Sequence, residues 1–243
     1  MERFRKKYRH ELKFLVDERD LALIESRIKN VLQPDKHNGE KGYYTIRSIY
    51  WDGYDDNCRE ENESGVSPRE KYRIRSYDCN NELIFLECKS KNHDMTYKKS
   101  CRLTKEQFEC LMAGRPGVMK APEETDGESE EVLRKLQLNM QLHHYMPRVV
   151  VEYNRTAYIC HEGNVRITFD KHIAGSGYLK KFFDRDMPKR PVMQPGMHVL
   201  EVKYDEFLPN YIREILDYGK LRRTAYSKYY LCRQFNTAQR IIR

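Results

Sequence analysis

The chain has 243 residues, enough to bury a substantial core, and we expect one domain over residues 1–243. Its 45 Lys and Arg against 37 Asp and Glu give a formal net charge of +8, which suits an anionic partner such as phosphate, nucleic acid or an acidic surface. The seven cysteines show no zinc-site spacing, and no apolar run approaches the roughly 18 residues of a membrane span, so we expect a soluble, cytoplasmic protein without a membrane segment.

The first half of the chain is predicted to be rich in strands. Alternating side chains predict strands over residues 8–15, 42–52, 69–78, 82–91 and 95–104. The last three are separated by short turns and should form an antiparallel meander. A helix over about 18–32 follows Asp17, which can cap it, and residues 54–65 form either a short polar helix or a loop.

The second half mixes helices and strands. Thr104 is a plausible N-cap for a helix that stops near Gly114, and the acidic residues of about 115–130 indicate an exposed loop. The remaining elements are a helix over about 129–142, a strand hairpin over 148–173, a strand over 197–206 and helices over roughly 209–219 and 224–237.

A row of cations recurs on one face of several predicted strands. Strand residues alternate sides, so Lys71, Arg73 and Arg75 share a face opposite Ile74. Other strands repeat the pattern with Lys13, Lys89, Lys98, Arg166 and Lys203. One such row usually faces solvent, because an antiparallel sheet often keeps one wet face. A closed barrel would instead turn the rows inward, at a high electrostatic cost unless a dense anion such as a phosphate chain is bound.

Three of these strands also carry a Glu two residues before a Lys, at Glu11, Glu87 and Glu201. Each carboxylate has two interpretations. It can balance the charge of neighbouring cations through ion pairs, or it can bind a divalent metal that bridges phosphate oxygens.

Six segments together resemble a known family. They are KYRIRSY, LECKSK, EYNRTAY, VRITFD, LEVKYD and AYSKYYL. The chain resembles the triphosphate tunnel metalloenzyme (CYTH-like) superfamily and, more closely, the catalytic domain of the vacuolar transporter chaperone (VTC) polyphosphate polymerases. Each motif alone is weak, but six in order are specific, and the resemblance covers nearly the whole chain.

The resemblance implies an α+β fold, with an antiparallel β-barrel of about eight strands flanked by helices and a basic lumen. It implies a polymerase that transfers the γ-phosphoryl group of ATP to a phosphate or polyphosphate end with Mn²⁺ or Mg²⁺. ATP, inorganic polyphosphate and tripolyphosphate are then the expected partners, and nucleic acid is not. A triphosphatase or polyphosphatase with water as acceptor, or a non-catalytic polyanion-binding module, remains open.

The resemblance also implies residue roles. Arg73, Arg75, Glu201 and Lys203 would be catalytic, with Glu201 as the metal carboxylate and Glu11 or Glu87 as alternative metal ligands. The phosphate-binding residues would be Lys13, Arg73, Arg75, Lys89, Lys98, Arg155, Arg166, Lys203 and Lys228.

Two positions depart from the family pattern. A second helical lysine is expected one turn before Lys228, and here that position is Ala225. Alternation puts Arg155 on the face of Val149 and Val151, so either a bulge turns Arg155 inward or its assignment is wrong.

Overall fold

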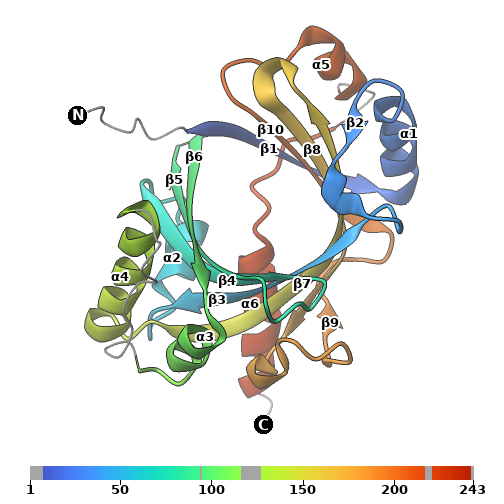
Figure 1. The fold of residues 1–243 in the computed structure, drawn as a ribbon. Coiled ribbons are helices and arrows are strands. Elements are labelled where there is room, and N and C mark those ends of the chain that lie inside the picture. The colour runs from blue at the N-terminus through green and yellow to red at the C-terminus, as the bar shows by residue number, and fades with distance from the viewer. Residues whose placement is uncertain (1–7, 94, 116–126, 217–220, 242–243) are drawn as a thin grey trace, which may run out of the picture.

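A computed structural model describes residues 8–93, 95–115, 127–216 and 221–241 (Figure 1). Within these residues, eight antiparallel strands close into a barrel in the order β7-β3-β4-β5-β6-β1-β10-β8, and β8 pairs back onto β7. The barrel strands are β1 (Arg9–Asp17), β3 (Tyr44–Asp52), β4 (Arg69–Tyr77), β5 (Ile84–Asn92), β6 (Met95–Leu103), β7 (Met146–Cys160), β8 (Val165–Ser176) and β10 (Met197–Tyr204). The short strands β2 (Gln33–Pro34) and β9 (Arg190–Pro191) pair with β7 and β8.

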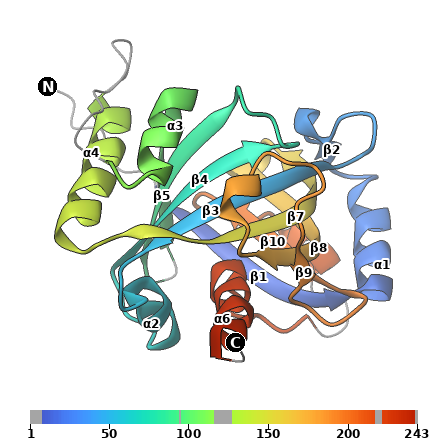
Figure 2. The ribbon, with the colours of Figure 1, turned by 90° about the horizontal axis from the view of Figure 1, so that it is seen from below.

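Helices flank the barrel (Figures 1 and 2). They are α1 (Glu18–Ile28), α2 (Asn57–Glu63), α3 (Lys105–Met112), α4 (Gly127–Leu142), α5 (Asn210–Leu216) and α6 (Lys228–Ile241). Both predicted caps are confirmed: Asp17 accepts from the backbone N–H of Asp20, and Thr104 forms a capping box with Gln107. No helix in the described part of the chain is long and apolar enough to cross a membrane. The predicted fold class is confirmed.

The strand register separates an outer face from an inner one. Ile49 of β3 lies opposite Ile74 of β4, which lies opposite Leu86 of β5, and all three belong to one buried cluster. Residues of α3 and α4, including Leu111 and Leu136, complete this cluster on the outside of the barrel. On each of these strands, the residues that alternate with the buried ones therefore face the barrel interior.

Strand β7 corrects the expectation about Arg155. Val149 and Val151 do not pack on an outer layer; they cluster with Tyr229 and Cys232 of α6, which packs on the inner face of β7. The β7–β8 register is irregular between Glu152 and Asn154, but Arg155 needs no bulge to face inward because the valine face is itself the inner face. The alternation was right, and the assumption that an apolar face lies outside was wrong.

Most predicted elements are present, with shifted ends. Residues 54–65 contain the helix α2, which resolves that alternative. Helix α1 ends at Ile28 rather than at residue 32. Most of the loop expected at about 115–130 lies outside the described residues, as do 217–219 of the predicted helix over 209–219; helix α4 already begins at Gly127.

The C-terminal helix begins later than predicted. It starts at Lys228 instead of residue 224, because Ser227 accepts a hydrogen bond from the backbone N–H of Tyr230 and so occupies the capping position. Residues 221–227, which we call the strap, precede it without helical structure. Figure 1 shows the strap, in red, crossing the barrel opening.

The strap pairs with the free edge of β1. Strands β1 and β6 pair only at Arg9 and His10 among the described residues. Beyond that point Phe14 forms a bridge with Arg223, and the backbone N–H of Thr224 donates to the carbonyl of Lys13 at 2.8 Å. The strap thereby covers backbone groups that β6 leaves unpaired.

We expect Ile74→Ala to lower the free energy of unfolding by about 2–5 kcal/mol, because Ile74 is fully buried between the barrel and its outer helices. Urea denaturation measures the change. The matched control is Leu138→Ala on α4, where the side chain is 51% exposed and the change should stay within about 0.5 kcal/mol. Similar losses of stability in both variants would mean that Ile74 does not lie on the packed outer face of the barrel.

Candidate functional site

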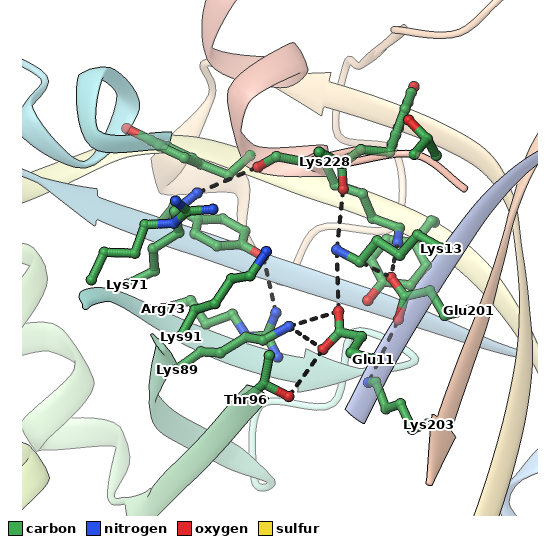
Figure 3. A pocket seen from close by; sticks show the side chains of 18 of the residues that line it. Glu11, Lys13, Lys71, Arg73, Lys89, Lys91, Thr96, Glu201, Lys203 and Lys228 are labelled. Atoms are coloured by element: carbon green, nitrogen blue, oxygen red, sulfur yellow. Dashed lines mark hydrogen bonds and ion pairs between the residues drawn. The ribbon is translucent and has the colours of Figure 1, made fainter. Parts of the chain in front are cut away.

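A cationic pocket of about 420 Å³ lies between the inner faces of the strands, the strap and the start of α6 (Figure 3). The cations that line it are Lys13, Arg69, Lys71, Arg73, Arg75, Lys89, Lys91, Arg155, Lys203, Arg223 and Lys228. Among the described residues, the acidic side chains that line it are two, Glu11 and Glu201. This excess of positive charge favours an anion of high charge density.

Strand pairing explains why the basic rows converge. Lys71 of β4 lies opposite Lys89 of β5, and Glu11 of β1 lies opposite Lys203 of β10. Directly paired residues point to the same side of a sheet, so the charged rows of neighbouring strands lie side by side on one face. The row Lys71, Arg73 and Arg75 faces the pocket and not solvent.

Glu201 of β10 stands among cations from several elements. Its Oε1 is 2.7 Å from Lys228 Nζ on α6 and 3.9 Å from Lys13 Nζ on β1. Its Oε2 is 3.4 Å from Arg155 Nη2 and 3.5 Å from Lys203 Nζ. Burial raises the pKa of Glu201, but Lys228 and the other cations outweigh it and hold the pKa well below its usual range. Glu201 is therefore ionised despite being buried.

Glu11 of β1 is a second ionised carboxylate close by. Lys89 Nζ lies 2.8 Å from its Oε1, and Lys13 Nζ lies 3.2 Å from the same atom. Burial raises the pKa of Glu11, and the attraction of Lys89 and Lys13 outweighs it, so the pKa lies well below its usual range. Because Lys13 reaches both Glu11 and Glu201, the two carboxylates share one ammonium group (Figure 3).

Two pocket lysines lose part of their charge near neutral pH. Burial lowers the pKa of Lys203 to about 7, although Glu201 and Glu11 act in the opposite direction. Burial also lowers the pKa of Lys71 to about 7, and repulsion from Arg69 and Lys13 adds to the shift. Lys228 differs, since the carboxylates of Asp170 and Glu201 outweigh its burial and raise its pKa.

Glu87 of β5 holds the two arginines of β4 in place. Its Oε2 accepts from Arg73 Nε at 2.7 Å and lies 3.6 Å from Arg75 Nη1, while its Oε1 accepts from Lys98 Nζ at 2.9 Å. Burial raises the pKa of Glu87, but the cations, Arg75 first, bring it well below its usual range. Glu87 therefore does not line the pocket itself, but it orients Arg73 and Arg75, which do.

The predicted site residues mostly meet. Those that line the pocket are Glu11, Lys13, Arg73, Arg75, Lys89, Arg155, Glu201, Lys203 and Lys228. Three do not line the pocket: Glu87, Lys98 and Arg166. The half-exposed Lys98 binds Glu87, and Arg166 forms an ion pair with Asp35 at 2.8 Å. Their phosphate or metal roles stay predictions.

Several lining residues were missed. Lys91 lies on the same predicted row as Lys89 but was given no role, and extending the row of Lys71 by one position would have found Arg69. Tyr50 lies on a predicted strand but was given no role, and Arg223 and Thr224 lie where the strap has no periodic pattern. Residues 225–227 belong to the segment AYSKYYL, which supported the family resemblance without a predicted pocket role. Asp170 binds Arg155 through two hydrogen bonds of 2.6 and 2.7 Å and also pairs with Lys228, which fixes both cations.

The donor groups fit a divalent metal that arrives with phosphate. The described residues contain no group of three or more His, Cys, Asp or Glu that could hold a metal alone. Mg²⁺ usually binds through one or two carboxylates together with substrate phosphates, and Glu201 and Glu11 supply such a pair. Thr168 of β8 lies opposite Glu201 in the sheet, and its buried hydroxyl has no hydrogen-bond partner, which leaves one more oxygen ligand near Glu201.

Comparisons with known proteins identify a family for this chain. The family model of the VTC domain matches residues 8–235. A search of curated protein sequences finds no match. Similar solved structures include a Pyrococcus horikoshii protein (14% identity, TM-score 0.48, covering 94% of this chain and 99% of that one). A second is a Bacillus halodurans protein proposed to be an adenylate cyclase (14% identity, TM-score 0.48, covering 86% of this chain and 86% of that one). A third is the Mimivirus capping enzyme triphosphatase (12% identity, TM-score 0.39, covering 86% of this chain and 86% of that one). At these values the structural likenesses carry no argument about activity.

We expect Glu87→Gln to destabilise the protein by about 3 kcal/mol, because it leaves the buried Arg75 and the partly buried Arg73 without their counter-charge. Glu131→Gln on α4 is the control, since its ion pairs with Lys99 and Lys135 lie near the surface and are worth about 0–1 kcal/mol. Urea denaturation of both variants measures the difference. Equal, small effects would show that Glu87 does not hold the arginines.

Proposed function

We propose that this chain, which belongs to the VTC domain family, is a polyphosphate polymerase. It would transfer the γ-phosphoryl group of ATP to a phosphate or to the end of a polyphosphate chain. The observation that carries the proposal is the pocket inside the barrel, where cations from several strands and α6 outnumber the two carboxylates. A chain of phosphates supplies the missing negative charge along the length of such a space.

The arginines are positioned before any phosphate binds. Glu87 fixes Arg73 and Arg75, and Asp170 fixes Arg155. Arginine binds phosphate oxygens in a two-pronged manner, whereas lysine acts as a compact point charge. Groups held in advance need little rearrangement when charge develops in the reaction, so their stabilisation is fully available to the transition state.

The proposed chemistry asks little else of the chain. Phosphoryl transfer has a loose transition state, with charge spread over the equatorial oxygens. Lys13, Lys89 and Lys228 would offset that charge, while Glu11 and Glu201 limit the repulsion between these lysines. When the acceptor is itself a phosphate, it is already a nucleophile, and no side chain needs to activate it.

Glu201, with Glu11 as a second ligand, would hold Mn²⁺ or Mg²⁺. The ion would supply positive charge between phosphate oxygens. We also propose a cytoplasmic location, where ATP is present; it is supported by the absence of disulfides among the described cysteines.

Incubation of the purified protein with ATP and Mn²⁺ tests the polymerase. We expect a ladder of anionic polymer on a gel. Free phosphate alone would favour a triphosphatase or polyphosphatase that uses water as acceptor. If neither product forms while tripolyphosphate still binds, the chain is a polyanion-binding module.

In the same assay Glu201→Gln should lower Mn²⁺-dependent turnover about a hundredfold, because the amide lacks the charge that a hard cation prefers. Tripolyphosphate binding without metal should survive, since the change also removes one repulsive charge. Titration of Mn²⁺ against turnover and binding separates the two effects. Glu11→Gln is the matched variant: if only that change alters the metal response, the metal carboxylate is Glu11.

Binding of tripolyphosphate should take up protons above neutral pH. In the free protein Lys203 has a pKa of about 7, so at pH 8 it is largely uncharged. A bound polyanion stabilises the ammonium form of Lys203 and raises its pKa, so binding weakens as pH rises, by up to about tenfold per pH unit.

Calorimetry in buffers of different ionisation enthalpy measures this proton uptake. Lys203→Arg is the control, because arginine stays charged and its variant should take up fewer protons than the wild type. The difference between the two proteins cancels the ligand's own titration. Identical proton uptake would contradict the role of Lys203.

A further inference from the structure

Ser227, the last residue of the strap, has a hydroxyl group at the pocket wall. Lys71 Nζ donates to Ser227 Oγ at 3.4 Å, and the backbone N–H of Tyr230 donates to the same oxygen at 3.3 Å. Both Ser227 and Lys71 line the pocket, and Figure 3 shows Lys71 reaching into it from β4. A nucleophilic oxygen and an amine therefore meet where the proposed function places a reactive phosphate chain.

Lys71 can act as a base in this position. Its burial, together with Arg69 and Lys13 nearby, brings its pKa to about 7, so a substantial fraction of it is an uncharged amine at neutral pH. The Tyr230 N–H keeps Ser227 Oγ in place at the start of α6. A positioned hydroxyl beside an amine of matched pKa is the arrangement that activates serine for nucleophilic attack.

We propose that Ser227 is a phosphoryl acceptor, so that the protein phosphorylates itself at the entrance of α6 when it binds ATP. This inference rests on the proposed function, because the pocket must hold a phosphoryl donor. It adds to that function an acceptor within the chain itself.

The step balances as follows. A bond forms between Ser227 Oγ and the γ-phosphorus of ATP, and the bond from that phosphorus to the β–γ bridging oxygen breaks. The hydroxyl proton passes to the amine of Lys71, and ADP leaves with the bond electrons on its terminal oxygen. The product is a phosphoserine at the N-terminus of a helix, where the helix dipole stabilises a negative group.

Other hydroxyl groups of the pocket are less suited. Burial raises the pKa of Tyr226 to about 12, which makes its phenol harder to ionise. The hydroxyl of Tyr50 already accepts a hydrogen bond from Arg73 at 2.9 Å. Thr224 lies on the same strap and lines the pocket, so it serves as an internal comparison.

Mass spectrometry after incubation with ATP and Mn²⁺ tests the proposal. Phosphoserine withstands an acid quench, and trypsin releases residues 224–228 as one peptide, within which fragmentation separates Thr224, Tyr226 and Ser227. We expect one added phosphoryl unit on Ser227. Ser227→Thr keeps both the hydroxyl and the helix cap and should retain the modification, whereas Ser227→Asn keeps the cap alone and should lose it completely. Thermal unfolding verifies that both variants are folded.

The outcomes separate this inference from the proposed function. Polymer without a modified Ser227, or a modification that persists in Ser227→Asn, overturns the inference alone. A modified Ser227 without polymer supports the inference and contradicts the polymerase. If tripolyphosphate does not bind and neither product forms, both proposals are wrong. Lys71→Met should slow the modification at least tenfold, and an unchanged rate would remove Lys71 as the base.

Discussion

Repulsion between cations that face one another inside a closed barrel is the constraint on which the rest of this structure depends. The cost is reduced by three buried carboxylates: Glu87 behind Arg73 and Arg75, Asp170 behind Arg155 and Lys228, and Glu201 among four cations. A fourth, Glu11, neutralises Lys89 and Lys13. Partial loss of charge on Lys71 and Lys203 lowers the remaining repulsion between the cations. These carboxylates allow the barrel to close around its cations, while the remaining excess charge is available to a ligand.

Rigidity and adaptability are divided between these groups. Arg73, Arg75 and Arg155 are held by buried carboxylates, so they define a fixed frame for phosphate oxygens. Lys13 contacts two carboxylates and a strap carbonyl at 3.1 Å, so it can exchange partners when an anion enters. This division follows from chemistry: a planar guanidinium gains from a fixed orientation, and an ammonium group does not.

The period of two in the sequence was enough to predict the basic rows, because Lys71, Arg73 and Arg75 keep strict alternation with the buried Tyr72 and Ile74. That the rows converge inside a barrel was implied by the family resemblance. Alternation identifies faces but not which face is inside, and β7 shows the limit, since its inward-facing valines pack against α6. Lys98 and Arg166 lie on the correct face yet outside the lining, because they bind Glu87 and Asp35 instead. The pairing of the strap with β1 could not be predicted, since it depends on an edge of β1 that only the closed fold creates.

The strap also sets an order of events during protein synthesis. Residues 221–227 emerge from the ribosome after every barrel strand, yet they pair with β1, which emerges first. Until then the edge of β1 and one wall of the pocket stay incomplete. Lys71 has not met Ser227 of the strap, and Glu201 has not met Lys228 of α6. The wall that the strap and the start of α6 supply is therefore the last part of the pocket to be synthesised.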